Sequence, residues 1–324
     1  MGFNVNKIEN SEFYVNKAFK KASNLILKIR NKNKLEYLKD KESRELDTIK
    51  DNLNNDIQNI IDQFPNPKTL NPFYKELIDN KIGLEKIHMH LKVLKEIIRK
   101  LNVLTQNYKL KFSRTKNINE LPGIKTIYLG RVKKIFKKID KDFIWLDNAR
   151  RNFKEFPQIK ELPTFCLCGY PNVGKSTLLN KLTPASAKVK SYAFTTLKLN
   201  LGYLNNDCQK YQIIDTPGFF DRPFEKMNIV EKQAYLAIKH LTKKIFFIID
   251  PTSSCGYSFD EQTQMFKRVK KMFDDKTIIV LINKIDLMNQ EMKIDVDSQF
   301  KKKIYISAEK GENLDKIKDE IISK

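Results

Sequence analysis

The spacing of hydrophobic residues changes once along the chain, near residue 161. Before that point apolar side chains recur every three or four positions, the repeat of a helix with one buried face. Pro65 and Pro67 end one helical stretch because a proline cannot donate a backbone hydrogen bond, and Pro122-Gly123 marks a second break. The pattern predicts helices over 11–31, 35–64, 72–80, 84–107 and 124–153, which together form an all-α helical-bundle domain.

After residue 161 short apolar runs alternate with helical stretches. Strands are predicted over 164–168, 201–204, 211–214, 244–249, 277–282 and 303–306. The runs 245–249 and 278–282 are continuously apolar, which is typical of strands covered by helices on both faces. The alternation predicts an α/β domain with a doubly wound, mostly parallel sheet. We therefore expect a helical domain over 1–160 and an α/β domain over 161–324.

Charge distinguishes the two halves. The formal net charge is +22, and residues 1–161 hold 35 Lys or Arg against 20 Asp or Glu. Within 109–154 there are 14 basic residues against 4 acidic ones. An even spread would indicate only a solvated lysine-rich surface, whereas so dense a cluster favours a nucleic-acid surface. The candidate RNA contacts are Lys109, Lys111, Arg114, Arg131, Lys133, Lys134, Lys137 and Lys138.

Composition excludes several other classes. A hydrophobic fraction of 41% argues against disorder throughout, and no apolar run approaches the roughly 18 residues that cross a bilayer. The start of the chain lacks the apolar stretch of a signal peptide. Four cysteines do not make a disulfide framework, and Cys166 and Cys168 alternate along a predicted strand, as core residues do. We expect a cytoplasmic protein with no membrane or DNA partner.

A phosphate-binding motif follows the predicted strand 164–168. Its glycines allow the backbone N–H groups to wrap phosphates at the start of a helix. Lys175 adds a positive charge toward the terminal phosphates, and the hydroxyl of Ser176 is a ligand for Mg²⁺. The predicted nucleotide-binding residues here are Gly169, Tyr170, Pro171, Asn172, Val173, Gly174, Lys175, Ser176 and Thr177.

A second motif, Asp215-Thr216-Pro217-Gly218, ends another predicted strand. Asp215 is placed to hold the Mg²⁺ shell through water, and the amide of Gly218 is placed to sense the γ-phosphate. Together with Lys175, Gly218 is a predicted catalytic group. The two motifs indicate a nucleoside triphosphate site with bound Mg²⁺.

Two further motifs identify the base. The carboxylate of Asp286, in Asn283-Lys284-Ile285-Asp286, accepts two hydrogen bonds from N1 and the exocyclic amine of guanine, which adenine does not offer. Asn283 is expected to brace the loop and the base edge. Ser307-Ala308, after the last predicted strand, would bring a backbone amide to the guanine oxygen. The order and spacing of the motifs predict GTP or GDP as the ligand and exclude ATP.

Residues 191–196 lie between the first two motifs, in a segment long enough to be a mobile switch loop. A threonine in such a loop contacts Mg²⁺ and the γ-phosphate only while the triphosphate is bound. We assign that role, both metal binding and catalysis, to Thr196, with Thr195 as the alternative.

Several segments together resemble the NOG subfamily of Obg-related GTPases, the nucleolar GTP-binding proteins. They are residues 169–176, 192–196 and 250–257 in the second half and residues 71–77 and 112–115 in the first. The resemblance implies assembly of the large ribosomal subunit, with precursor rRNA and ribosomal proteins as partners and the helical domain against rRNA. Eukaryotic members, which are nucleolar, carry a long C-terminal extension. The chain ends soon after Ser307, and we therefore expect the archaeal short form.

The expected catalysis is unusual. Phe219 follows the second motif, where Ras-like proteins place the glutamine that orients the attacking water. A hydrophobic residue cannot do this, so slow hydrolysis is expected unless the ribosome or an ion assists. The resemblance to GTPases with asparagine at position 172 implies K⁺ beside the β and γ phosphates; the alternative is that Asn172 only shapes the loop.

The sequence is compatible with three functions. The chain could be a GTP-driven assembly switch, or an RNA-binding placeholder in which GTP is structural. A GTPase of the Obg or Era type with a tRNA or signalling target would share the four motifs but leaves the basic helical half unexplained.

Overall fold

The structure is a computed structural model that describes residues 5–25, 33–156, 162–183, 190–191, 200–206, 209–216 and 226–322. The chain divides into two compact units, a helical unit of Gly2–Leu70 with Ile78–Phe156 and a sheet unit of Asn71–Leu77 with Pro157–Lys324. The domain boundary expected after residue 160 falls at 157–161, outside the described residues. None of the described helices combines the length and the apolar character needed to cross a membrane.

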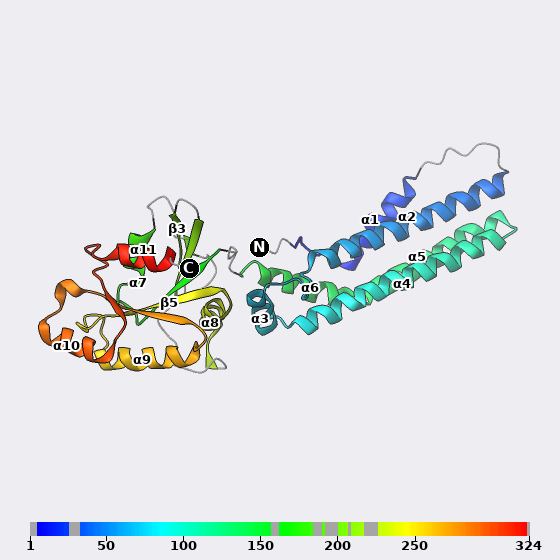
Figure 1. Ribbon diagram of the computed structural model, residues 1–324. Helices are drawn as coiled ribbons and strands as arrows, with labels where there is room; N and C mark the ends of the chain where they lie inside the picture. The colour runs from blue at the N-terminus through cyan, green and yellow to red at the C-terminus, as the bar shows by residue number, and fades with distance from the viewer. Residues whose placement is uncertain are drawn as a thin grey trace. The chain divides into compact units, whose positions relative to one another are not determined.

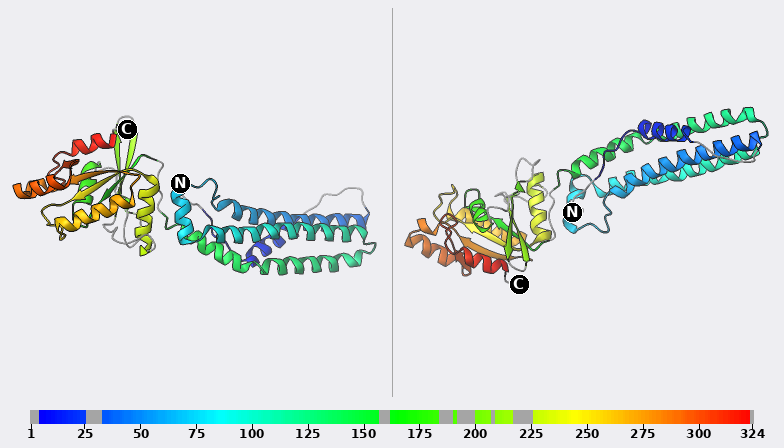
Figure 2. Two further views of the ribbon diagram at one scale, coloured as in Figure 1. Left: turned by 60° about the horizontal axis from the view of Figure 1, so that its bottom comes forward. Right: turned by 90° about the horizontal axis from the view of Figure 1, so that it is seen from above.

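The helical unit is built around long helices. Its elements are α1 (Ser11–Ser23), α2 (Lys34–Gln63), α4 (Leu84–Arg114), the 3₁₀ turn η1 (Ile118–Glu120), α5 (Leu121–Lys137) and α6 (Asp140–Phe153), while α3 (Pro72–Lys81) is shared between the units. Figure 2 shows α2, α4 and α5 running side by side, and α1 packs on α2 and α5. The side chain of Asn33 accepts a hydrogen bond from the amide of Glu36 and so caps the start of α2.

The single helix predicted over 124–153 is wrong, because the structure has two helices there. α5 ends at Lys137 and α6 begins at Asp140, with Ile139 outside the helical region at φ −103° and ψ 8°. Apolar spacing continues through the break because Ile139 is itself buried, so periodicity alone gave no sign of it. Pro122, predicted to mark a break, lies in the first turn of α5, where its missing N–H has no helical partner to lose. α4 also continues past the predicted end at 107.

Aromatic residues fill the centre of the helical unit. Tyr108 of α4 and Tyr128 of α5 are almost fully buried, with ring centroids 5.5 Å apart. The hydroxyl of Tyr128 lies 2.9 Å from that of Thr105, which satisfies it inside the core. Burial raises the pKa of Tyr128 to about 12. The predicted bundle with one apolar face per helix is therefore confirmed.

The sheet unit contains, in its described part, a seven-stranded sheet in the order β2-β3-β4-β1-β5-β6-β7. The strands are β1 (Thr164–Cys168), β2 (Lys190–Ser191), β3 (Asn200–Asn206), β4 (Gln209–Asp215), β5 (Thr242–Ile249), β6 (Thr277–Ile282) and β7 (Lys303–Tyr305). β2 and β3 run antiparallel to their neighbours, and the other pairs are parallel. The predicted mostly parallel sheet is confirmed, and β2 was not predicted.

Helices cover both faces of this sheet. α7 (Lys175–Leu182) and α11 (Leu314–Ile322) lie on one face, and α8 (Ile229–Leu241) and α9 (Phe259–Met272) lie on the other (Figure 1). The 3₁₀ turn η3 (Ile285–Leu287) and α10 (Gln290–Gln299) follow β6. Cys166 and Cys168 are fully buried in β1, as predicted. Strand order reverses at β1, so the loops after β1, β4 and β5 converge at one edge, where doubly wound folds bind ligands.

Candidate functional site

The loop between β1 and α7 has the shape of a phosphate-binding loop. Gly169 has φ 145° and Gly174 has φ 102°, a region that L side chains rarely adopt. A Cβ at Gly169 would lie 2.5 Å from the carbonyl oxygen of Ile248, and one at Gly174 would lie 2.2 Å from Nδ2 of Asn283. The loop can therefore approach its neighbours this closely only with glycine. Between the glycines lie Tyr170, Pro171, Asn172 and Val173, and Lys175, Ser176 and Thr177 open α7.

The ammonium group of Lys175 is held inside this loop. Its Nζ donates to the carbonyl oxygens of Gly169, at 3.0 Å, and Tyr170, at 2.6 Å. Burial lowers the pKa of Lys175, and the negative charge of Asp215 opposes that shift. The two carbonyl oxygens therefore fix the position of this cation at the phosphate-binding loop.

Ser176 and Asp215 meet as a Mg²⁺ site requires. Ser176 Oγ donates to Oδ2 of Asp215 at 2.7 Å, and Nδ2 of Asn200, at the start of β3, donates to the same oxygen at 3.2 Å. Asp215 is only 5% exposed, yet its Oδ1 has no hydrogen-bond partner among the described residues. A buried carboxylate oxygen left free beside a serine hydroxyl fits a hydrated Mg²⁺ ion. Asn200 was not predicted, because nothing in its sequence neighbourhood marks it.

Other predicted residues of the phosphate side are only partly described. Thr216 Oγ1 donates to the carbonyl oxygen of Leu167 at 2.9 Å and so ties the end of β4 to β1. Pro217 and Gly218 lie outside the described residues, as do Thr195 and Thr196 of the predicted switch loop and Phe219.

A cavity of about 280 Å³ lies beside the ends of β6 and β7. Eight predicted residues line it, namely Asn172, Gly174, Thr177, Asn283, Lys284, Asp286, Ser307 and Ala308. The structure thus brings the phosphate-binding loop and both base-recognition motifs to one cavity. Ser254, Leu287 and Glu309 also line it and were not predicted. The signal for Ser254 was its place after β5, whose carboxyl end lies at the same edge.

Asn283 joins the three loops around the cavity. Its Nδ2 donates to the carbonyl oxygen of Val173 at 2.7 Å, and its Oδ1 accepts from the amide of Ala308 at 2.9 Å. The side chain is 2% exposed, so both bonds are shielded from water. The bracing of the loop predicted for Asn283 is found, and its contact with the base edge stays a prediction. Ser307-Ala308 was predicted to bring a backbone amide to the guanine oxygen, and the amide of Ala308 donates to Asn283 here.

Asp286 presents a charged acceptor to the same cavity. It lies in η3, two residues after Lys284, whose φ is 60°. A hydrogen bond from Ser307 lowers the pKa of Asp286, and Lys310, 3.8 Å away, acts in the same direction. The carboxylate is therefore ionised at neutral pH and accepts hydrogen bonds only, which suits the paired donors of a guanine edge.

Lys284 is held by a buried acid that follows β5. Its Nζ donates to Oδ2 of Asp250 and to Oγ of Ser254, each at 2.7 Å. Burial of Asp250 opposes its ionisation, but the hydrogen bond from Lys284 and those from two hydroxyls leave the pKa of Asp250 below its usual value. Asp250 had been singled out only through the family resemblance.

The predicted RNA contacts differ in how free they are. Lys109 is half-buried and pairs with Asp47 at 2.5 Å. Lys111 and Arg131 lie over the ring of Tyr108, 4.8 and 5.6 Å from its centroid. Arg114, at the end of α4, is exposed, as are Lys133, Lys134 and Lys137 of α5 and Lys138, which caps the end of that helix. Lys109 is thus the least suited of the eight to bind phosphate.

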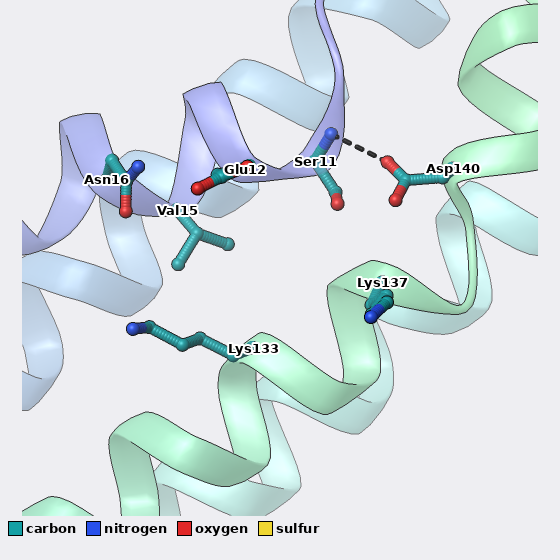
Figure 3. A pocket seen from close by; sticks show the side chains of 7 residues that line it. All are labelled: Ser11, Glu12, Val15, Asn16, Lys133, Lys137 and Asp140. Atoms are coloured by element: carbon teal, nitrogen blue, oxygen red, sulfur yellow. Dashed lines mark hydrogen bonds between the residues drawn. The ribbon is translucent and has the colours of Figure 1, made fainter.

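Two of these lysines face acidic neighbours. Lys133 and Lys137 line a cavity of about 290 Å³ with Glu12 of α1 and Asp140 of α6, and Asp140 accepts from the amide of Ser11 at 2.9 Å (Figure 3). The carboxylates reduce the positive potential on this side of α5. Lys134 and Lys138 do not line this cavity and are the better pair for a polyanion.

Comparison with known proteins matches both units. Residues 4–160 match the family described as the NOG1 N-terminal helical domain, and residues 164–284 match the family described as 50S ribosome-binding GTPase. A protein of Methanocaldococcus jannaschii named only as uncharacterized is 38% identical over 238 residues, covering 72% of this chain and 66% of its own.

Nucleolar GTP-binding protein 1 of Arabidopsis thaliana is 34% identical over 233 residues, and that of Saccharomyces cerevisiae is 33% identical over 242. Each match covers 72% of this chain, but only 35% and 36% of those longer proteins. A crystal structure of a nucleolar GTP-binding protein 1 of Plasmodium falciparum is 32% identical and covers 51% of this chain and 88% of its own, with a TM-score of 0.41.

The fold and the site define a P-loop GTPase preceded by a helical domain. The matches to both halves place it further: the chain belongs to the NOG1 family of nucleolar GTP-binding proteins.

Proposed function

We propose that the protein binds and hydrolyses GTP as an assembly factor of the large ribosomal subunit, and that it binds rRNA through its helical unit. The observation that carries the proposal is that one chain combines a cavity suited to guanine with exposed lysines on α5. The family description as a 50S ribosome-binding GTPase supports the target, and the names of the curated relatives support GTP binding and, in a eukaryote, a nucleolar location.

The chain's own groups divide the work at the nucleotide. Lys175 would transfer its hydrogen bonds from loop carbonyls to the terminal phosphates, and Asp286 would select the base. Ser176 and Asp215 would hold Mg²⁺, with Thr196 as a further ligand in the GTP state. Bound Mg²⁺ neutralises charge on the β and γ phosphates. The amide of Gly218 would donate a hydrogen bond to the γ-phosphate, so that its loop responds to the presence of GTP.

Because Phe219 cannot orient the attacking water, we expect intrinsic GTP hydrolysis to be slow and to be activated by the ribosome or by K⁺. Asn172 has φ 60°, a conformation that asparagine tolerates better than most residues, which supports a role in shaping the loop. If Asn172 also binds K⁺, GTP turnover should be about tenfold or more faster in K⁺ than in Na⁺ at equal ionic strength, because a fixed cation offsets transition-state charge. Phosphate release measured in the two salts decides this, and equal rates would remove K⁺ from the proposal.

Neutralising Lys134 and Lys138 together, each to Gln, should weaken binding to large ribosomal subunits and flatten its salt dependence. Each lost phosphate contact reduces the slope of log K against log salt by about 1, so the pair should reduce it by about 2. The measurement is co-sedimentation of the full chain across a salt series, with a GTP analogue and with GDP. Lys270→Gln with Lys271→Gln, two exposed lysines of α9, is the matched control.

If the Lys134→Gln, Lys138→Gln variant shows the same salt dependence of binding as the wild type, these two lysines do not contact the RNA. If the wild-type chain does not sediment with the subunit at any salt concentration, the ribosomal target is wrong. Retention on tRNA instead would favour the alternative of a tRNA-directed GTPase.

Thr196→Ala distinguishes an assembly switch from a placeholder with structural GTP. For a switch, the variant should accumulate on precursor particles, because the loop no longer responds to the γ-phosphate. Sucrose gradients of cells that carry only the variant would show the factor retained in the large-subunit fractions. Thr195→Ala tests the alternative assignment of the same role, and a normal gradient for both variants favours the placeholder.

A further inference from the structure

The turn after β5 is organised by one buried carboxylate. Asp250 is 0% exposed, and its Oδ1 accepts from the amide of Thr252, at 3.0 Å, and from its hydroxyl, at 2.6 Å. Its Oδ2 accepts from Ser254 Oγ and from the amide of Cys255, each at 3.0 Å, and from Lys284 Nζ at 2.7 Å. A single side chain therefore fixes the turn and pairs with the ammonium group of Lys284.

The backbone of Asp250 is clamped as well. Its N–H donates to Oε1 of Gln262 in α9, and its carbonyl oxygen accepts from Nε2 of the same residue, both at 2.8 Å. The ring of Tyr257, at the end of the turn, stacks on that of Tyr170 in the phosphate-binding loop, with centroids 4.0 Å apart and planes at 24°. The turn is thus attached to α9 on one side and to the phosphate-binding loop on the other.

Lys284 connects this turn to the cavity. Both Lys284 and Ser254 line the cavity, and the hydroxyl of Ser254 accepts from Lys284 Nζ at 2.7 Å. Lys284 also begins the turn that carries Asp286, and its left-handed backbone is held between β6 and η3. A lysine with a long, flexible side chain loses much conformational freedom in such a wall, so its position depends on a partner for the ammonium group.

We propose that Asp250 is a positioning residue of the nucleotide site, which holds Lys284 so that the wall formed by Lys284 and Ser254 is in place for the guanine base. The inference rests on the proposed guanine nucleotide site and adds a role for the turn after β5. Asp250 itself does not touch the ligand, so its loss should weaken binding of GTP and GDP alike and leave the chemical step unchanged.

Asp250→Asn tests this with nearly the same volume. The amide nitrogen would face donors from Lys284, Ser254 and Cys255, so Lys284 loses its carboxylate acceptor and its counter-charge and keeps the hydroxyl of Ser254. We expect the dissociation constant for GDP, measured by calorimetry with Mg²⁺ on the full chain, to rise about tenfold. The KM for GTP should rise in parallel, with kcat within about twofold of wild type.

Two further variants separate positioning of Lys284 from shaping of the turn. Thr252→Ala removes the hydroxyl that lies 2.6 Å from Oδ1 of Asp250 and 2.9 Å from Oγ of Ser254, and it leaves the contact of Asp250 with Lys284. Its GDP affinity should therefore stay within about twofold of wild type. Lys284→Met in the Asp250→Asn background should bind GDP as Lys284→Met alone does, because the two residues act through one contact. Asp274→Asn, at an exposed acid of the same unit, is the control.

Three results would overturn the inference. They are an unchanged GDP affinity in Asp250→Asn, an equal loss in Thr252→Ala, and additive losses in the double variant. Failure of the wild-type chain to bind GDP is a different outcome, because it would refute the nucleotide site on which the inference rests.

Discussion

Asp286→Asn is expected to change the base preference of the site from guanine to xanthine. The carboxylate lines the cavity as a pure acceptor, and guanine offers it two donors. Hydrogen bonds to a charged group contribute about 1.5–3 kcal/mol each, so losing two should lower GDP affinity by about 10²- to 10⁴-fold. The amide of asparagine has a donor that matches the C2 carbonyl of xanthine, and xanthosine diphosphate should therefore bind the variant more tightly than GDP.

Calorimetric titration of the variant and wild type with both diphosphates measures the exchange. Asp315→Asn, at an acid in the first turn of α11, controls for the loss of one negative charge. If the Asp286→Asn variant still prefers GDP, the cavity does not read the base through this residue. The roles of the phosphate-binding loop, of Asp215 and of Asn283 would not be affected by that result.

Gly174→Ala should abolish nucleotide binding while the helical unit remains folded. The new Cβ would meet Nδ2 of Asn283 at 2.2 Å, and φ 102° disfavours any L side chain. Either Asn283 gives up its bond to Val173 or the loop shifts, and each costs on the order of 1–3 kcal/mol in a buried site. We expect GDP affinity to fall by more than about 100-fold.

The matched control is Gly123→Ala in α5. No atom lies within 4 Å of the Cβ position there, and the backbone is helical, so the substitution should be neutral or slightly stabilising. Calorimetry with GDP reports binding, and the fluorescence of Trp145 in α6 reports the helical unit during thermal unfolding. GDP binding within about threefold of wild type in Gly174→Ala would mean that the loop accommodates a side chain and that the close approach to Asn283 is not required.

The sequence predicts the nucleotide site because its residues are placed by local rules. Gly169 and Gly174 bound a loop between a strand and a helix, and parallel strands end at one edge, so motifs far apart in the chain must converge there. Contacts between side chains from different strands were beyond such rules. Asn200, which donates to Asp215, and Asp250, which accepts from Lys284, stand in no local motif that marks them. Each meets its partner only because of the order of the strands in the sheet.

The helical unit shows the opposite limit. Periodicity located the helices but read through the break at Ile139, since a buried residue at a non-helical position keeps the apolar spacing. Counting charges found the basic region, but could not tell Lys109, which is paired with Asp47, from Lys134, which is exposed. Ion pairs between helices depend on packing that a single sequence does not display.

The amide of Asn283 bonds to two other loops at once, and this restricts how the site can change over evolutionary time. A substitution that moves the backbone near Val173 or Ala308 also displaces the loop that carries Asp286. Changes in the three loops should therefore be tolerated in combinations rather than one at a time. Base selectivity and phosphate binding would change together, whereas the exposed lysines of α5 belong to the other unit and could change independently of this amide.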